Sequence, residues 1–404
     1  MKKNKNDTKI AINNSDLSDC IAQNKKVKPK KIRGKKFRFA MASIAIATII
    51  LAICFFCTAF IGDTSVFSFI ENYEFTALTP QNEYSVRKYA QDNFCTIDLS
   101  SGDELNVLQL TDIHLGCGFM TIDTDKKVVN EIFSAVKTTK PDFIVITGDA
   151  LSPIYVRSGT KNSHNELTAL LMVMDKIGLP WAFCFGNHDG EGTASKSYIA
   201  SALEKNENCV FLNGDKNLTG NGNYYIKVYN DAQELTTAMF FLDTCSGWFM
   251  QYDHVYNDQI EWYESVVATL KNENPTIKTL MFFHIPLPEY NSGYNAYLNG
   301  DQNVQLILGK KNEKISTVVQ RNFFSVIKKL DSTKWIFCGH EHKNNYTIRF
   351  VDSDIYLTYA MSMDFSAYIL TKYQTEHRGA TGIFIKGGNV TIKQAPQDNG
   401  YRFN

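Results

Sequence analysis

The longest apolar stretch of the chain covers residues 39–61 (FAMASIAIATIILAICFFCTAFI) and contains no charged residue. A helix of about 20 apolar residues is long enough to cross a bilayer. Nine Lys and Arg residues stand within residues 25–38, directly before this stretch. Because basic clusters stay on the cytoplasmic side, the pattern predicts a single-pass cell-membrane protein with a basic cytoplasmic tail (1–38), a transmembrane anchor (39–61) and an extracytoplasmic remainder.

A cleaved signal peptide is the alternative, because Cys57, Thr58 and Ala59 offer a cleavage site. The basic region before the apolar stretch is long for a signal peptide, and the stretch itself exceeds the usual apolar region of one. The pattern therefore favours an uncleaved anchor over cleavage.

After the anchor, residues 62–103 are polar and weakly periodic, which predicts a stalk and the edge of a domain. From residue 104 to residue 404, short apolar runs alternate with amphipathic segments. The runs predict strands at 107–110, 143–147, 181–185, 239–242, 280–283 and 335–338, and an all-β end at 346–350, 355–359, 382–385 and 390–392. The amphipathic segments predict helices at 126–138, 166–177, 258–270 and 317–330. This alternation predicts an α/β fold with largely parallel strands in sheets that are covered on both faces.

The formal net charge of zero hides an asymmetry between the two ends of the chain. Residues 1–38 hold 13 Lys or Arg against three Asp, a net of +10, so the remainder carries −10. An acidic catalytic part has no general field that attracts polyanions, and we therefore expect no nucleic acid as a partner.

Polar residues that can bind metal follow nearly every predicted strand. The segments after the strands are Thr111-Asp112-Ile113-His114, Gly148-Asp149, Gly186-Asn187-His188-Asp189, His284 and Gly339-His340-Glu341-His342. Ligands in α/β sheets gather at the carboxyl ends of strands, and five of the eight histidines stand at such ends. A single histidine there is more often structural, but five of them with three Asp or Asn residues indicate a metal site.

The spacing of these residues has a physical reason. In an extended chain the side chains of Asp112 and His114 point to the same side, and His340 and His342 repeat this spacing. Glycines at 148, 186 and 339 allow sharp turns or close approach of the backbone. Carboxylates mixed with imidazoles, without thiolates, favour Mn, Fe or Zn over Ca or Mg.

These five segments resemble the blocks DxH, GD, GNH(D/E), H and GHxH of the calcineurin-like metallophosphoesterase superfamily. The match runs in the right order from residue 105 to about residue 345. Features that resemble the purple-acid-phosphatase-like branch are the segment HIPLPEY at 284–290, Gln259 with Trp262, and Arg378-Gly379-Ala380. The resemblance implies a four-layer α/β/β/α sandwich of two mixed sheets flanked by helices, preceded here by one transmembrane helix.

Carried over block by block, the resemblance implies two divalent transition-metal ions. The first would be held by Asp112, His114 and His342, the second by Asn187, His284 and His340, with Asp149 bridging both. A metal-bridging hydroxide would attack phosphorus. His188 would contact the phosphate and act as general acid, with Asp189 orienting it.

One departure concerns the tyrosine that ligates ferric iron in purple acid phosphatases. It stands three residues after the Asp of the second block, where this chain has Ser152, and Tyr155 is too far along to match. A ferric requirement is therefore in doubt.

The substrate-facing residues are less clearly indicated. Residues 284–318 form a long polar insertion whose Tyr290, Tyr294 and Tyr297 would either line the site or pack locally. Cys117 and Phe119 are expected in the core rather than at the rim. Arg157, Lys161, His164, His254 and His377 are expected at the surface.

The sequence thus predicts a membrane-anchored phosphoesterase that acts on a phosphate-ester substrate, with a monoesterase preferred over a phosphodiesterase. The alternatives are a non-catalytic surface protein that keeps the fold for binding, and a nuclease, which the acidic charge disfavours. The oligomeric state and the physiological substrate are not predicted.

Overall fold

The computed structural model describes residues 32–247, 252–316, 322–366 and 376–404. The chain divides into two compact units, residues 1–55 and residues 56–404. Most of helix α2 (Ile32–Phe56) belongs to the first unit. The described residues contain one helical stretch, beginning in α2, that is long and apolar enough to cross a membrane by length and composition. A signal sequence meets the same criterion.

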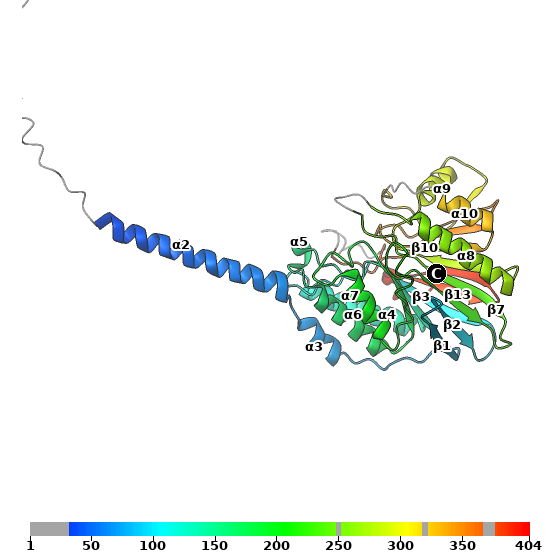
Figure 1. The fold of residues 1–404 in the computed structure, drawn as a ribbon, viewed down its shortest axis with the longest axis horizontal. Coiled ribbons are helices and arrows are strands. Elements are labelled where there is room, and N and C mark those ends of the chain that lie inside the picture. The colour runs from blue at the N-terminus through cyan, green and yellow to red at the C-terminus, as the bar shows by residue number, and fades with distance from the viewer. Residues whose placement is uncertain (1–31, 248–251, 317–321, 367–375) are drawn as a thin grey trace, which may run out of the picture. The chain divides into compact units, whose positions relative to one another are not determined.

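The second unit is built on two mixed sheets (Figure 1). The nine-stranded sheet has the order β1-β2-β6-β7-β8-β10-β12-β11-β9, and the five-stranded sheet has the order β14-β13-β3-β4-β5. The strands of the larger sheet are β1 (Tyr84–Tyr89), β2 (Phe94–Leu99), β6 (Tyr224–Tyr229), β7 (Leu235–Phe241), β8 (Lys278–Phe282), β9 (Val304–Leu308), β10 (Thr333–Cys338), β11 (Thr347–Phe350) and β12 (Ile355–Tyr359). Those of the smaller sheet are β3 (Glu104–Leu110), β4 (Phe143–Thr147), β5 (Trp181–Cys184), β13 (Gly379–Lys386) and β14 (Asn389–Pro396).

Helices cover the outer faces of the two sheets, α4, α6 and α7 on one side and α8, α9 and α10 on the other (Figure 1). The helical segments are η1 (Cys57–Ile61), α3 (Ser65–Asn72), α4 (Ile122–Thr139), α5 (Tyr155–Ser158), α6 (Ser163–Ile177), α7 (Lys196–Lys205), α8 (Asn257–Glu273), α9 (Pro288–Leu298), α10 (Phe323–Leu330) and η3 (Gln397–Asn399). This arrangement is the predicted four-layer α/β/β/α sandwich.

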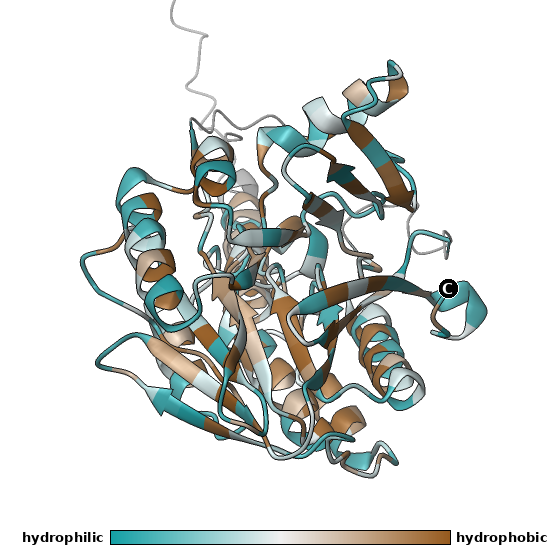
Figure 2. Ribbon diagram, turned by 90° about the vertical axis from the view of Figure 1, so that its right-hand side faces the viewer, coloured by the Kyte–Doolittle hydropathy of each residue, from teal (hydrophilic) through white to brown (hydrophobic). Residues whose placement is uncertain are grey.

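Alternating side chains of the central strands fill two separate cores. In β10, Trp335 and Phe337 join the core that contains β3, β4 and β5, whereas Ile336 and Cys338 join the core under α8 and α10. Successive side chains of a strand point to opposite faces, so a strand between two layers must be apolar at every position. Figure 2 shows this as brown strands in the interior and teal on the outer turns of the helices.

The predicted strands and the first three predicted helices are confirmed, with shifted ends. Of the fourth predicted helix, residues 323–330 form α10, and residues 317–321 lie outside the described residues. The strands β1, β2, β6 and β9 were not predicted.

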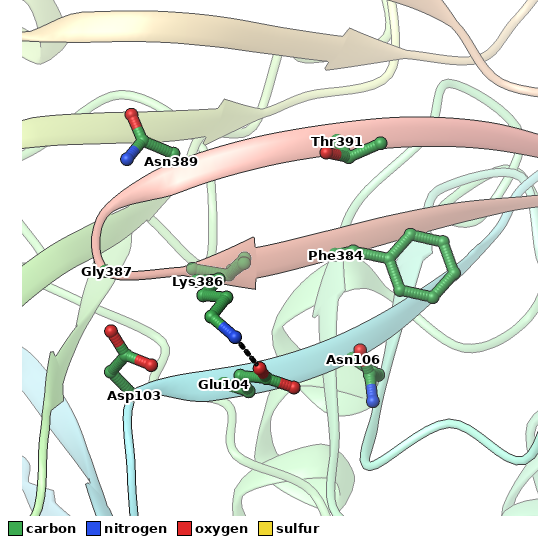
Figure 3. Close-up of a pocket in the computed structure, with 9 residues that line it drawn as sticks. Asp103, Glu104, Asn106, Phe384, Lys386, Gly387, Asn389 and Thr391 are labelled. Atoms are coloured by element: carbon green, nitrogen blue, oxygen red, sulfur yellow. Dashed lines mark hydrogen bonds and ion pairs between the residues drawn. The ribbon is translucent and has the colours of Figure 1, made fainter.

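Lys386 of β13 contacts Glu104 of β3, its partner in the antiparallel register, at the sheet end drawn in Figure 3.

The segment 62–103, expected as a stalk and domain edge, contributes α3, β1 and β2. The ring of Tyr73, directly after α3, stacks on Phe133 of α4 with centroids 4.6 Å apart. β2 pairs in parallel with β6, and β1 forms the outer edge of the nine-stranded sheet. The segment is therefore packed into the sandwich rather than extended away from it.

The segment 284–318 was expected as a long polar loop, but Pro288–Leu298 form α9 and Val304–Leu308 form β9, and residues 317–318 lie outside the described residues. Tyr290 is fully buried, and its hydroxyl donates to the carbonyl of Ile336 at 2.9 Å. Tyr294 is also buried in the core under α8 and α10. Of the two readings left open for these tyrosines, local packing is the correct one for both.

Candidate metal centre

The five predicted segments meet at the carboxyl ends of strands from both sheets. The structure brings two groups of three side chains together, with all ligand atoms of each group within 4.8 Å of one another. One group is Asp112, His114 and His342, and the other is Asp149, His284 and His340. β3, β4 and β5 of the small sheet carry the first three segments, while β8 and β10 of the large sheet carry the last two.

The backbone at these ligands is not extended, which corrects the geometric reason expected for the spacing. Asp112, His114, Asp149 and His340 have φ values of 52°, 54°, 50° and 84°. Non-glycine residues in this left-handed region are uncommon and cluster at functional sites, where surrounding contacts hold the strain. The side chains therefore converge through turned backbone and not through the alternation of a strand.

The glycines are required for close approach, as predicted. A Cβ on Gly148, whose φ is +84°, would lie 2.5 Å from the amide nitrogen of Gly186. A Cβ on Gly186 would lie 2.2 Å from Oδ1 of Asp149. The ends of β4 and β5 can therefore hold Asp149 and Asn187 side by side only because both positions lack a side chain.

The first group is completed by a carboxylate that the sequence did not indicate. Nε2 of His342 lies 3.3 Å from Oδ1 of Asp112 and 3.2 Å from Nε2 of His114. On the other side of the ring, Nδ1 of His342 lies 3.0 Å from Oδ2 of Asp364. A carboxylate behind a histidine fixes its tautomer and orientation, a usual arrangement for metal-binding histidines. Asp364 belongs to no motif block, so nothing in its sequence context marks it.

In the second group, Nε2 of His284 lies 3.1 Å from Oδ2 of Asp149 and 3.3 Å from Nδ1 of His340. Nδ1 of His284 lies 2.8 Å from the carbonyl oxygen of Thr147 and is oriented as its donor. Nε2 of His284 is thereby left facing the carboxylate. Oδ2 of Asp149 also lies 3.8 Å from Nε2 of His114, so this oxygen stands between the two groups.

Histidines and carboxylates of the two groups offset each other's charge. Burial, with the nearby His342, lowers the pKa of His114 to about 4, and burial with His284 lowers that of His340 to about 3. Burial also opposes charge on His284, but the carboxylates of Asp149 and Asp112 outweigh it and raise its pKa to about 9. In the absence of metal, a proton on His284 offsets the negative charge of the buried carboxylates, and a bound cation can take over this role.

The donor set of both groups fits two transition-metal ions. It consists of imidazole nitrogens, carboxylates and one amide oxygen, with no thiolate. Oδ1 of Asn187 is buried and has no hydrogen-bond partner among the described residues. Such an orphaned buried oxygen is rare in native proteins and suits a metal ligand. Six of the seven predicted ligand residues therefore stand in two groups that could each hold an ion, and Asn187 remains a predicted ligand with a buried, unpartnered oxygen.

His188 lies at the accessible side of the centre, with 21% of its side chain exposed. Its Nε2 lies 3.9 Å from Oδ2 of Asp149, and its amide donates to Oδ1 of the same residue at 2.8 Å. Its Nδ1 lies 2.8 Å from Oε2 of Glu191. Burial lowers the pKa of His188, but Asp149 and Glu191 outweigh this effect and raise it.

The role expected for Asp189 needs correction. Its fully buried carboxylate accepts backbone N–H groups of Asp149, Leu151 and Gly186 at 3.0, 3.0 and 2.7 Å. It therefore fixes the loops that carry the ligands, whereas Glu191 is the residue that orients the His188 ring. The residue beside a histidine in the chain points to a different side, so Glu191, three positions on, reaches the ring instead.

Other candidate residues lie away from the two groups. Ser152 and Cys117 are buried, and Phe119 is 54% exposed, so its expected place in the core is wrong. The hydroxyl of Tyr155 contacts Thr58, which agrees with its exclusion as an iron ligand. The side chains of the remaining candidates are partly exposed: Arg157, Lys161, His164, His254 and His377. Tyr252 belongs to no motif and was not predicted; its ring packs edge-on against His340 with centroids 4.3 Å apart.

A fold of two mixed sheets with paired metal-binding groups at the strand ends defines a metal-dependent phosphoesterase class. The family model for calcineurin-like phosphoesterases matches residues 105–344, and the chain belongs to this family. The resemblance stated from the motifs is thereby confirmed.

Similar proteins from yeast and a plant have names that refer to phosphatases. The chain is 29% identical over 276 residues to "Phosphatase DCR2" of Saccharomyces cerevisiae, covering 61% of this chain and 45% of that protein. It is 23% identical over 274 residues to "Probable inactive purple acid phosphatase 14" of Arabidopsis thaliana, covering 59% of this chain and 66% of that protein. The chain thus spans between about half and two thirds of the length of these relatives.

Solved structures of low sequence identity are also similar. A dimetal phosphatase from Danio rerio matches at a TM-score of 0.45 with 9% identity, over 72% of this chain and 95% of that one. Purple acid phosphatase PPD1 from yellow lupin matches at 0.39 with 9% identity, over 77% of this chain and 55% of that one.

Proposed function

We propose that this protein is a membrane-anchored extracytoplasmic phosphoesterase that hydrolyses phosphate esters at a dinuclear metal centre. The observation that carries the proposal is the convergence of two buried His/Asp groups on Asp149, in a chain of the calcineurin-like phosphoesterase family. Asp112, His114 and His342 would hold the first ion, and Asn187, His284 and His340 the second, with Asp149 between them. Mn, Fe or Zn suits these donors.

The two ions, when bound, would supply Lewis acidity toward the phosphoryl oxygens and an activated water as nucleophile. The chain's own residues orient the substrate and move the proton. His188 stands at the accessible side with Nδ1 facing Glu191, so its Nε2 is the nitrogen that can protonate the leaving oxygen. Asp364 and the carbonyl of Thr147 hold His342 and His284 in their binding orientations.

The uncleaved anchor is supported by the way the end of the apolar stretch packs. Ala59 is buried, and its carbonyl accepts the amide of Lys161 at 2.6 Å and the hydroxyl of Thr160 at 3.2 Å. Asn162 and Asn165 both donate to the carbonyl of Ile61 at 2.9 Å. Cleavage after Ala59 would remove the hydrogen bonds of Ala59 from the folded unit.

The rival is a non-catalytic binding protein, and it has some support because the matched plant relatives are named probable inactive purple acid phosphatases. Against it, all seven ligand residues and His188 are present in this chain. Loss of catalysis under relaxed selection generally removes ligands, since each buried ligand without its ion is costly. We therefore favour catalysis, with a monoester preferred.

The test uses the full chain purified in detergent and loaded with Mn²⁺. We expect turnover of p-nitrophenyl phosphate and, more slowly, of bis-p-nitrophenyl phosphate, together with about two metal ions per chain by elemental analysis. Asp149→Ala should lose both metal and turnover, because Asp149 serves both ions. Asp243→Asn, which changes a buried carboxylate paired with Lys196, is the matched control for burial of charge. A metal-loaded wild type that hydrolyses neither ester would favour the binding protein.

A further inference from the structure

Five large apolar side chains that belong to neither core are exposed in one region of the second unit. Phe60 and Ile61 are 46% and 57% exposed, Phe119 and Met120 are each 54% exposed, and Val156 is 78% exposed. We call these five residues the apolar patch. Single exposed apolar residues are ordinary, but a group of them marks a binding surface.

Backbone contacts hold the three parts of the apolar patch together. The amide of Met120 donates to the carbonyl of Ser158 at 3.1 Å, and the ring of Phe119 lies against Gly159. The amide of Asp63 donates to the carbonyl of Cys117 at 2.8 Å. The loop at 117–120, helix α5 with its C-terminal turn and the segment 59–63 therefore form one surface.

The same surface adjoins the accessible side of the metal centre. Nζ of Lys161, whose amide binds Ala59, lies 3.3 Å from the carbonyl of Glu191, and Glu191 binds the ring of His188. Within α5, Tyr155 contacts Thr58, and Arg157 is close enough to His188 for an electrostatic interaction. One short helix thus touches both the apolar segment 57–61 and the surroundings of His188.

The occupant of the apolar patch follows from where the apolar stretch ends. Residues 39–61 are uninterrupted by charge, and Ile61 is the last of them. If this stretch spans a bilayer, Phe60 and Ile61 lie at the boundary between acyl chains and headgroups, and the contacts described above hold the rest of the patch next to these two residues. The headgroup layer is only about 5–8 Å thick on each side, a depth comparable to one side chain. Arg157 and Lys161 beside the patch suit the phosphates of that layer.

We propose that the apolar patch rests in the lipid surface and that the metal centre hydrolyses phosphate esters of lipids held in that surface. This inference rests on the proposed function and adds its substrate class. In the reaction, water adds to phosphorus, the bond from phosphorus to the lipid-bound oxygen breaks, and that oxygen takes up the proton delivered by His188. The lipid stays in the bilayer while its phosphate reaches the centre past Arg157.

Membrane contact is tested independently of catalysis by tryptophan quenching. The full chain is reconstituted in vesicles of phosphatidylcholine brominated on its acyl chains, as wild type and as Val156→Trp and Leu298→Trp. Leu298 is 65% exposed at the end of α9, far from α5 in Figure 1. The brominated lipid should quench the added emission of Val156→Trp and leave that of Leu298→Trp unchanged. Equal emission of Val156→Trp in brominated and ordinary lipid overturns the contact, whether or not the protein is active.

The substrate class is tested with phosphatidic acid and phosphatidyl-p-nitrophenol in the same vesicles, and with p-nitrophenyl phosphate as the soluble ester. The combined variant Phe119→Ser, Met120→Ser, Val156→Ser should hydrolyse lipid about tenfold more slowly or worse, since lipid-surface binding scales with buried apolar area. Its rate on the soluble ester should stay within about twofold of wild type, which also shows that it folds. The control variant Leu298→Ser, Ile307→Ser, at exposed positions on α9 and β9, should match wild type on both.

The outcomes separate the two proposals. Hydrolysis of the soluble ester without hydrolysis of either lipid leaves the phosphoesterase standing and overturns the lipid substrate. Equal lipid hydrolysis by wild type and the patch variant likewise overturns the role of the patch. Hydrolysis of neither kind of ester by metal-loaded wild type overturns the phosphoesterase and its lipid substrate together, while the quenching result still decides the membrane contact.

Discussion

The residues of the metal centre are held under backbone strain that their neighbours maintain. Four ligands adopt positive φ, which costs about 1–3 kcal/mol for a non-glycine residue. The amide of His340 donates to Asp112 at 3.1 Å, and the amide of His114 donates to the carbonyl of Asp149 at 3.0 Å. These bonds tie each strained segment to another ligand segment, so the geometry is set before any ion binds.

At this scale, we predict that His188→Ala lowers turnover by about 10²-fold or more with two metals still bound, because His188 moves a proton and ligates neither group. Glu191→Gln should lower turnover less, by about tenfold, since the ring of His188 stays in place but is oriented less firmly. The measurement is kcat with p-nitrophenyl phosphate alongside metal content. His164→Ala is the control, because His164 belongs to neither group and its ring packs edge-on against Tyr198 with centroids 4.6 Å apart. Full activity of His188→Ala would show that another group is the acid.

At the scale of elements, the candidate ligands follow the carboxyl ends of five strands, β3, β4, β5, β8 and β10. Helix α6 buries Glu166 completely, near Asp125 and Asp189, which lie behind the ligand loops. Burial and these two carboxylates raise the pKa of Glu166 well above its ordinary value. The short helix α5 carries Tyr155, whose hydroxyl contacts Thr58, and Arg157, which is close enough to His188 for an electrostatic interaction.

The buried Glu166 leads to a prediction about pH. Its pKa is raised in the folded state, so the folded protein binds more protons than the unfolded chain above the ordinary pKa of 4.5. The stability is therefore fully present below that pH and is lost as the pH rises, by up to about 1.4 kcal/mol per unit, until the raised pKa is passed. Glu166→Gln has no such loss, so its advantage over wild type should grow from pH ~5 to pH ~8.

The measurement is the thermal midpoint of both proteins at the two pH values, with a chelator present so that metal does not contribute. Glu131→Gln serves as the matched control, since Glu131 is partly exposed and shows how a surface carboxylate behaves. If the thermal midpoints of wild type and Glu166→Gln change in parallel with pH, the raised pKa of Glu166 is contradicted.

At the scale of the whole molecule, the chain separates its charge along its length, +10 before the apolar stretch and −10 after it. Basic residues before an apolar stretch favour the cytoplasmic side, which is the orientation that we propose for residues 1–38. The docking of residues 59–61 on the loop 160–165 joins the end of the stretch to this unit.

We therefore predict that the chain stays intact in the membrane of a producing cell. Tags at both ends should co-purify from carbonate-washed membranes as one band of full length, and protease added outside should remove the C-terminal tag only. Ala59→Arg, which blocks signal peptidase, is the control and should give the same band as wild type. A soluble product beginning at Phe60 in the wild type, absent from Ala59→Arg, would establish cleavage instead.

Many strands and candidate ligands could be predicted because they depend on residues that are close together in the sequence. Short apolar runs such as 107–110 and 335–338 favour buried strands over helices, because they are too short for most helices and end in turn residues. The strands β1 and β9 escaped because they are mostly exposed edge or near-edge strands, whose polar residues resemble loops. The ligands Asp112 to His342 were predictable because each follows a strand that ends at the same edge of the fold.

What only the tertiary structure decided concerns contacts between distant segments. Asp364 reaches His342 from a loop without any motif, and Glu191 rather than Asp189 faces His188, because side-chain direction depends on turns that a sequence pattern does not encode. Likewise Phe60, Phe119 and Val156 share a surface only through folding. The sequence by itself determined the layers, an apolar stretch long enough to span a membrane and the kinds of candidate ligand. The folded chain determined which side chains meet, because proximity across sheets is a property of packing and not of spacing.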